Sequence, residues 1–348
     1  MITIIIPVHN QIEYTRQCIA TVRANTRAPY RLIVVDNGST EPVAGVAETA
    51  GATVVRSETN RGFAGGVNLG LAHAEGHVLL LNNDTLVPPG WLEGLEAALL
   101  SAPDIGMAGP MSNYVSGSQL IPDLNFGHID EIEAYAAQRR RDYPNAIRDV
   151  ARLVGFCLLI RDTALAAAGP LDEAYGVGNF EDDDYCVRVL RAGFRLVVDE
   201  GGFVFHYGNR TFQSLGLVDS AWDRLIETNA ALFGAKFDLR PEDRLDEYRQ
   251  ALQINREGGE ALRGGDLAAA LRHYRDAIRL APRLARNHND LAVALWQAGA
   301  RGQALERIKV ALQLEPDYAE ARENLLDMGR ALDRDAEVRA WLVALDAR

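Results

Sequence analysis

Two acidic segments and one histidine are the residues of this sequence that best fit metal chemistry. Residues 82–85 read Asn-Asn-Asp-Thr and end an apolar run. Residues 181–184 read Glu-Asp-Asp-Asp, and His206 follows them after 22 residues. Carboxylate oxygens are the ligands that Mg²⁺ prefers, and Mn²⁺ also accepts imidazole. The residue types and their order therefore predict a divalent-metal site with further carboxylates.

The elements that must position these residues alternate between short β-rich runs and longer helical stretches from residue 1 to about 235. This alternation is typical of an α/β domain with a mainly parallel sheet. The predicted strands are Ile2–Val8, Leu32–Val35, Thr53–Arg56 and His77–Leu81, and the predicted helices are Glu13–Ala24 and Phe63–Ala74. Ligands of open α/β sheets bind beyond the carboxyl ends of the strands. We therefore expect residues 9–10, 36–37 and 82–84 to meet in one crevice.

The second half of this region carries the other acidic segment. Residues 112–150 have weak periodicity and are interpreted as long loops plus a helix over Glu131–Arg141. A buried strand over Leu153–Ile160, a short helix over Thr163–Ala168 and a helix over Asp182–Ala192 follow. The carboxylate cluster is thus predicted at a helix N-terminus, where negative charge is favourable.

From about residue 240 the sequence becomes rich in Ala, Leu and Arg and repeats with a period of 34 residues. The matching positions are Gly265 and Gly299, Ala270-Leu271 and Ala304-Leu305, Ala277 and Ala311, and Pro282 and Pro316. This spacing resembles tetratricopeptide repeats, which are stacks of paired helices. Further helices are predicted over Glu242–Arg256, Glu320–Ala331 and Ala336–Ala347. The sequence therefore predicts two domains, residues 1–235 and residues 240–348.

Composition limits the classes of protein that fit. The chain has 348 residues, a net charge of −12 and 48% hydrophobic residues, which is typical of a globular protein. The negative charge argues against general binding to nucleic acid or to an anionic membrane. No apolar run approaches the roughly 20 residues of a transmembrane helix. Three cysteines without a CxxC pair indicate a reducing compartment, so we expect a cytoplasmic protein.

Taken together, the motifs of residues 1–235 resemble those of inverting family 2 glycosyltransferases with a GT-A fold. They occur in the order known from that family. They are Pro7-Val8-His9-Asn10, Val35-Asp36-Asn37-Gly38-Ser39-Thr40, residues 60–68, Leu81-Asn82-Asn83-Asp84-Thr85, Gly155-Phe156-Cys157, Phe180-Glu181-Asp182-Asp183-Asp184, and His206. The resemblance implies transfer of a sugar from a nucleotide-sugar donor, with UDP as the first expectation and dTDP as the second.

The resemblance also implies roles for the acidic residues. Asp84 occupies the last position of the family's Asp-x-Asp motif, in which Asn82 replaces the first Asp, and Asp84 and His206 would hold Mn²⁺ or Mg²⁺. Such an ion neutralises the charge that develops on the leaving diphosphate. Asp182 aligns with the general base that takes the proton of the acceptor hydroxyl. Glu181 and Asp183 remain alternatives for that role.

The remaining motif residues are expected around the donor. Asp36 is expected to accept a hydrogen bond from the uracil or thymine imide, although an ordinary Asp-Asn-Gly-Ser turn is the alternative. Arg210 could clamp the diphosphate, but a lone exposed arginine is the favoured interpretation. The other expected donor-binding residues are Pro7, Val8, His9, Asn10, Asn60, Gly62, Asn68, Asn82 and Asn83.

Two other interpretations of the residues stay open at this point, a nucleotidyltransferase and an inactive scaffold. A nucleotidyltransferase shares the acidic strand ends, whereas a Rossmann dehydrogenase is disfavoured because no G-x-G-x-x-G follows the first strand. A catalytically inactive scaffold would recruit partners through the helical repeats. For an active enzyme the acceptor is a saccharide or a polypeptide, and the repeats are expected to bind a protein partner or to form a homodimer.

Overall fold

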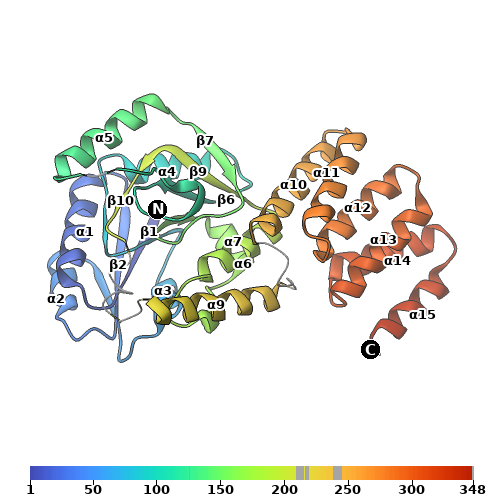
Figure 1. Cartoon of the computed structure of the whole chain (residues 1–348), viewed down its shortest axis with the longest axis horizontal. Coiled ribbons are helices and arrows are strands. Elements are labelled where there is room, and N and C mark those ends of the chain that lie inside the picture. Colours follow the sequence, from blue (N-terminus) through green and yellow to red (C-terminus); the bar gives the residue numbers. More distant parts are fainter. Residues whose placement is uncertain (125, 209–214, 216–218, 238–244, 347–348) are drawn as a thin grey trace. The chain divides into compact units, whose positions relative to one another are not determined.

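The computed structural model describes residues 1–124, 126–208, 215, 219–237 and 245–346 (Figure 1). Contacts divide the chain into two compact units, Met1–Leu232 and Phe233–Arg348. The first is an α/β unit built on an eight-stranded sheet, and the second is helical. Among the described residues, none of the helices combines the length and the apolar character that crossing a bilayer requires.

The sheet of the first unit has the strand order β3-β2-β1-β4-β8-β6-β9-β7. Its N-terminal half is parallel and consists of β1 (Ile2–Val8), β2 (Tyr30–Asn37), β3 (Thr53–Ser57) and β4 (His77–Leu81). Strand β1 is apolar at nearly every position because helices cover both faces of the sheet. Ile4 and Ile6 belong to the core on one face, whereas Ile5 packs on the other face against Gly70.

The second half of the sheet mixes strand directions. It contains β8 (Cys157–Ile160), β6 (Ile105–Met111), β9 (Arg195–Phe203) and β7 (Ile147–Val150). Strand β8 is antiparallel to β4 and β6, β9 is parallel to β6, and β7 is antiparallel to β9. A separate two-stranded sheet pairs β5 (Thr85–Leu86) with β10 (Phe205–His206). The expected α/β unit with a mainly parallel sheet is therefore confirmed.

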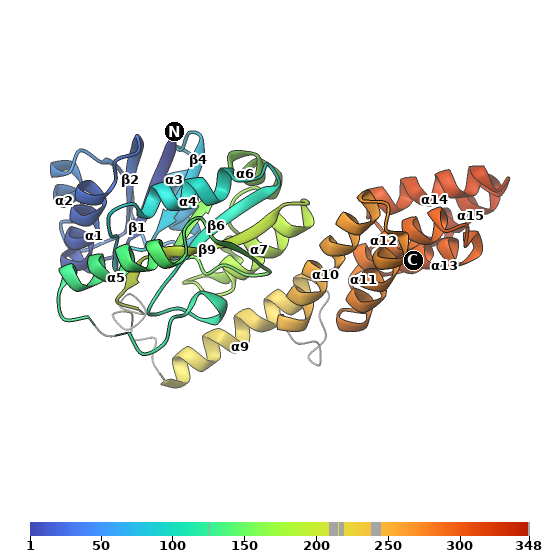
Figure 2. The same ribbon diagram turned by 90° about the horizontal axis from the view of Figure 1, so that it is seen from above.

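Helices cover the two faces of the sheet, and Figure 2 shows the same layers from above. One face is covered by α1 (Ile12–Asn25), α2 (Val43–Thr49) and α4 (Trp91–Leu100), whose apolar residues share a core with β1. The further helices of this unit are α3 (Gly62–Leu71), α5 (Ile129–Asp142), α6 (Asp162–Ala168), α7 (Glu181–Arg191) and α9 (Asp219–Lys236), the last of which contains the division between the units.

Two local predictions for this unit were wrong in part. The predicted strand over Leu153–Ile160 begins only at Cys157, because the backbone before it bonds to side chains instead of to a strand. Leu153 N donates to Cys186 Sγ at 3.3 Å, and Val154 N donates to Gln119 Oε1 at 2.8 Å. The region predicted as loops plus one helix, residues 112–150, also contains strand β7. Strand β7 has only four residues, so its sequence carries too little periodicity to reveal it.

The second unit is a stack of helices. They are α10 (Leu245–Arg263), α11 (Leu267–Leu280), α12 (Ala285–Gln297), α13 (Arg301–Leu314), α14 (Ala319–Ala331) and α15 (Asp335–Asp346). Gly265 and Gly299 have φ of +82° and +80° and lie in the turns before α11 and α13. Ala277 and Ala311 are fully buried, and Ala311 belongs to the hydrophobic core of this unit. Parts of the predicted helices Glu242–Arg256 and Ala336–Ala347 lie outside the described residues, as does Arg210.

Candidate active site

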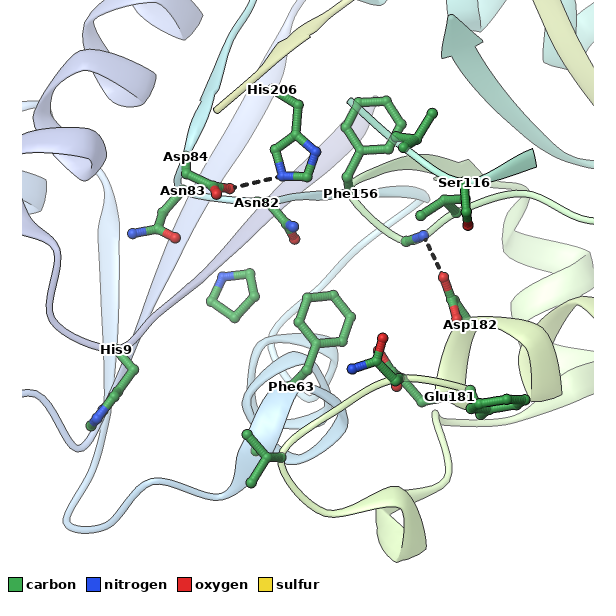
Figure 3. Close-up of a pocket in the computed structure, with 18 of the residues that line it drawn as sticks. His9, Phe63, Asn82, Asn83, Asp84, Ser116, Phe156, Glu181, Asp182 and His206 are labelled. Carbon is green, nitrogen blue, oxygen red and sulfur yellow. Dashed lines mark hydrogen bonds and ion pairs between the residues drawn. The ribbon is translucent and has the colours of Figure 1, made fainter. Parts of the chain in front are cut away.

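A cavity of about 560 Å³ opens where the predicted strand ends meet (Figure 3). Its lining comes from the ends of β1 and β4, from the start of α3 and from the start of α7. Pro7, Val8, His9, Asn60, Gly62, Asn82, Asn83, Asp84, Glu181, Asp182 and His206 all line it. Figure 3 shows Asp84 and His206 on one side of this cavity and Glu181 and Asp182 on the opposite side.

The first side of the cavity is organised by the short pairing of β5 with β10. His206 lies opposite Thr85 in this pairing, which brings its Nε2 to 3.1 Å from Asp84 Oδ1. Both residues are buried, and the Phe156 ring stacks on the imidazole at 5.2 Å between centroids. The two residues are 122 positions apart in the chain. Backbone pairing therefore fixes their geometry independently of any ligand.

The hydrogen bonds of His206 show that a cation fits between these two side chains. Nδ1 lies 2.8 Å from the carbonyl oxygen of Tyr114, which can only accept, so Nδ1 carries the proton. In the neutral ring Nε2 then directs its lone pair at the Asp84 carboxylate. Two acceptors at 3.1 Å repel each other unless a proton or a metal ion lies between them. The described residues contain no group of three or more His, Cys, Asp or Glu side chains suited to a metal, so a bound ion needs further ligands.

Asn83 and Asn82 support this side of the cavity in different ways. The Nδ2 of Asn83 donates to Thr15 Oγ1 at 2.9 Å and so ties the end of β4 to α1. The backbone N–H of Asn82 donates to the carbonyl of Phe156 at 2.8 Å. The Asn82 side chain lines the cavity beside Asp84. An amide at this position can contact a ligand hydroxyl without adding charge.

The opposite side carries Asp182, whose carboxylate is oriented by two backbone amides. Gly155 N donates to Oδ2 at 2.9 Å, and Asp183 N donates to Oδ1 at 2.9 Å. Burial is the largest cause that raises the pKa of Asp182, and the Asp183 charge adds to it, while Arg152 and these amides oppose the rise. A raised pKa makes this carboxylate a stronger base than an exposed aspartate.

The other acidic residues of the cluster have different surroundings. Asp183 pairs with Arg152 at 2.6 Å, and Asp184 pairs with Arg188 at 2.6 Å. Glu181 is buried, and burial followed by the Asp182 charge raises its pKa well above the usual value. Its Oε2 has no hydrogen-bond partner among the described residues. Asp183 and Asp184 are thus held in ion pairs, whereas Glu181 faces the cavity.

Three residues predicted to bind the donor do not line this cavity. Asp36 is fully buried, and its carboxylate accepts from Ser39 N at 2.9 Å and from Arg56 Nη1 at 2.5 Å. Asn10 Oδ1 accepts from Thr40 N at 2.9 Å. Asn68 Nδ2 donates to the Leu171 carbonyl at 2.9 Å and so ties α3 to the segment before α7. Their expected contacts with a nucleotide stay predictions.

Gly62 is placed where a side chain has no room. Its φ is +73°, and a Cβ atom there would lie 1.8 Å from the carbonyl oxygen of Gly176. This close approach brings the start of α3 against the segment that leads into α7. Phe63 N donates to the Val177 carbonyl at 3.1 Å across the same contact.

Several cavity residues were not predicted from the sequence. Arg152, Tyr114 and Asn179 line the cavity from irregular segments, and Trp222 lines it from α9. Arg152 carries the charge that compensates Asp183, at 2.6 Å. The sequence offered one signal for Arg152, which is its position just before an apolar run. That signal does not indicate which carboxylate the arginine pairs with.

This fold and this site define a GT-A glycosyltransferase, with carboxylates at the carboxyl edge of a mainly parallel sheet. Residues 3–166 match the family model "Glycosyl transferase family 2". An uncharacterized protein of Mycobacterium bovis is 32% identical over 219 residues, which cover 60% of this chain and 74% of that protein. The chain belongs to glycosyltransferase family 2, as its motifs predicted.

Two further similarities complete the comparison. An N-acetylglucosaminyl-diphospho-decaprenol L-rhamnosyltransferase of Mycobacterium tuberculosis is 27% identical over 217 residues, which cover 54% of this chain and 70% of that protein. A mannosyltransferase of Pyrobaculum calidifontis, solved with GDP-Man and Mn²⁺, is 15% identical with a TM-score of 0.45 and covers 99% of this chain and 84% of its own. The family assignment depends on the sequence matches.

Replacing Glu181 by Gln is expected to stabilise the fold more at pH 8 than at pH 5. A raised pKa means that the folded state holds this proton more tightly than the unfolded state. Stability is therefore lost as pH rises from the ordinary pKa through the folded pKa, and Gln avoids that loss. Gln has no charge to desolvate, and the charge that it removes contributes only about 0.3–1 kcal/mol at a helix N-terminus. Thermal unfolding at both pH values measures this, and an effect of Gln on stability that is no more favourable at pH 8 than at pH 5 contradicts it.

Proposed function

We propose that this chain is a metal-dependent inverting glycosyltransferase that takes a sugar from a nucleotide-sugar donor, UDP-linked first and dTDP-linked second. The observation that carries the proposal is the placement of two kinds of group on opposite sides of one cavity. Asp84 and His206 lie on one side, and Asp182 lies on the other. An in-line displacement needs this arrangement, because the acceptor attacks the anomeric carbon from the side opposite to the leaving diphosphate.

Asp84 and His206 would hold the metal ion, Mn²⁺ or Mg²⁺. Such an ion would stabilise the negative charge that develops on the leaving diphosphate. His206 is prepared for this role because Tyr114 fixes its tautomer at Nδ1. Asn82, beside Asp84, is placed to contact a hydroxyl of the donor. A proton on His206 Nε2 can occupy the same position when metal is absent.

Asp182 would act on the acceptor. Its carboxylate takes the proton of the attacking hydroxyl, the acceptor oxygen bonds to the anomeric carbon, and the bond from that carbon to the phosphate oxygen breaks. The electron pair of that bond leaves with the diphosphate, and the configuration at the anomeric carbon is inverted. The amides of Gly155 and Asp183 hold the carboxylate in place, so little ordering remains to be done at the moment of reaction.

The acceptor is proposed to be a saccharide, with a polypeptide as the alternative. The rhamnosyltransferase relative supports a saccharide, because its name gives a lipid-linked sugar as the acceptor. The helical unit supports a polypeptide or a second protein, since stacked helical repeats form extended binding surfaces. Its turns at Gly265 and Gly299 and its buried Ala277 and Ala311 fit a tetratricopeptide-like stack.

The helical repeats are also proposed to form a homodimer. Light scattering on the intact chain tests this proposal, and a measured mass of one chain at all protein concentrations would exclude the homodimer.

Calorimetric titration of UDP is the experiment that tests the donor site. Wild-type protein with Mn²⁺ is expected to bind UDP, and EDTA is expected to weaken that binding about 100-fold or more, because the diphosphate loses its charge partner. The same titration with dTDP ranks the two bases. The absence of binding by both nucleotides, with and without Mn²⁺ or Mg²⁺, would contradict the proposal and favour a scaffold.

A further inference from the structure

Two residues that line the cavity each have a buried polar atom without a hydrogen-bond partner among the described residues. The two atoms are Oε2 of Glu181 and Nδ2 of Asn179. Glu181 as a whole is only 6% exposed. An unpartnered buried polar atom costs about 1–3 kcal/mol, so such atoms are rare unless a ligand uses them. The Nδ2 of Asn179 is a hydrogen-bond donor, and the Oε2 of Glu181 can accept a hydrogen bond.

The backbone that presents these atoms is strained. Asn179 and Phe180 have φ of +71° and +73°, in the left-handed region that side chains other than glycine rarely adopt. Such strain persists only where the surroundings enforce it, and it often marks functional sites. With this conformation, residues 179, 180 and 181 all line one cavity.

Asn229 of α9 enforces this conformation. Its Nδ2 lies 3.0 Å from the Tyr175 carbonyl, 2.9 Å from that of Gly178 and 3.0 Å from that of Asn179. Asn229 is itself buried. On the other side the segment rests on Gly62, where a Cβ would lie 1.8 Å from Gly176 O. A segment fixed on both sides is preorganised to bind, because its ordering cost is met by folding.

We propose that Asn179 and Glu181 form a hydroxyl-binding subsite for a saccharide acceptor, next to Asp182. A hydroxyl accepts one hydrogen bond and donates another, which matches the Nδ2 of Asn179 and the Oε2 of Glu181. Glu181 lies beside Asp182 and away from Asp84 and His206 (Figure 3), and Asn179 also lines the cavity, two residues before Glu181. The inference deepens the proposed function and depends on it.

The same geometry favours a saccharide over a single Ser or Thr hydroxyl as the acceptor. Asp182 engages the hydroxyl that reacts, so the subsite needs a second hydroxyl close to the first. A sugar ring carries hydroxyls on adjacent carbons, whereas a Ser or Thr side chain offers only one. A saccharide therefore satisfies both unpartnered atoms and the base together.

Binding of simple glycosides tests the subsite without requiring turnover. The probes are methyl β-D-glucopyranoside, methyl β-D-N-acetylglucosaminide and methyl α-L-rhamnopyranoside, measured by saturation-transfer NMR with UDP and Mn²⁺ present. We expect wild type to bind at least one probe. Asn179→Ala and Glu181→Leu are each expected to weaken that binding roughly 5- to 30-fold, because each loses one hydrogen bond of about 1–2 kcal/mol. Titration with UDP is expected to be unchanged in both variants.

Asn145→Ala is the matched control, because Asn145 is also left-handed, with φ of +55°, but is exposed and does not line the cavity. It should bind the probe as wild type does. A deoxy analogue that lacks the contacted hydroxyl should bind wild type weakly and show no further loss in Asn179→Ala. The subsite is overturned if UDP binds but no glycoside does, if both variants bind the probe normally, or if a serine peptide binds instead. Failure of UDP to bind wild type would instead contradict the proposed function itself.

Discussion

Asp182→Asn is expected to lower the rate of sugar transfer by roughly 10²- to 10⁴-fold, the range that a positioned general base contributes. Asn has the same shape and can still accept from Gly155 N or Asp183 N, which now hold the carboxylate at 2.9 Å each. The change therefore removes the proton acceptor and leaves the cavity in place. Binding of UDP is expected to stay within about twofold of wild type, since Asp182 lies on the opposite side of the cavity from Asp84 (Figure 3).

Asp162→Asn is the matched control for this variant. Asp162 also lies in the first turn of a helix, α6, but it is exposed and does not line the cavity. Its rate should equal that of wild type. Full transfer activity in a folded Asp182→Asn protein would reject the assignment of the base and direct attention to Glu181.

The pH dependence of transfer follows from the same residue. A general base works only when deprotonated, so the rate is lost as pH falls through its pKa. Burial and the Asp183 charge raise the pKa of Asp182. In a plot of wild-type transfer rate against pH, the fall on the acid side should therefore lie at higher pH than an exposed aspartate would give. The residual transfer rate of Asp182→Asn should not show this fall.

The strand ends could be predicted from sequence because they depend on local patterns. Apolar runs such as Ile2–Val8 mark central parallel strands, and the residues after them must emerge at one edge of the sheet. Asp84, His9 and Asn82 were placed in the cavity on this basis and do line it. The motif that carries Asp182 also lies at the N-terminus of a helix, as its sequence indicated.

The ion pair of Asp36 could not be predicted from a local sequence pattern. Asp36 lies directly opposite Arg56 in the register of β2 and β3, and this cross-strand neighbour forms an ion pair with its carboxylate. The register depends on the packing of whole strands, so a motif read along one strand does not contain it. The pairing of Arg152 with Asp183 was missed for the same reason, since 31 residues separate the two.

The hydroxyl subsite was also beyond sequence reasoning. Asn179 comes from an irregular segment with no periodicity, and its position depends on three carbonyl contacts made by Asn229, about 50 residues later. Asn is only enriched at positive φ, so the residue type alone does not single out this position. Only the assembled structure shows that the Asn179 and Glu181 atoms remain without partners among the described residues.

Asp84→Ala is expected to abolish metal-dependent binding of UDP and to lower the transfer rate by about 10³-fold or more. The ion would lose the carboxylate ligand proposed for it, and charge stabilisation of several kcal/mol corresponds to this factor. The backbone should not move, because the Asp84 carbonyl still accepts from Tyr207 N at 3.0 Å and β5 still pairs with β10.

His206→Ala should have a smaller effect than Asp84→Ala, because a neutral imidazole contributes a ligand but no charge. Titrations of UDP with Mn²⁺ and with EDTA measure both variants, and Asp104→Ala, an exposed site away from the cavity, is the control. Wild type in EDTA should behave as Asp84→Ala does with Mn²⁺, since both lack the same ion. If Asp84→Ala keeps metal-dependent binding of UDP, a proton and not a metal ion lies between Asp84 and His206. The ion then binds elsewhere.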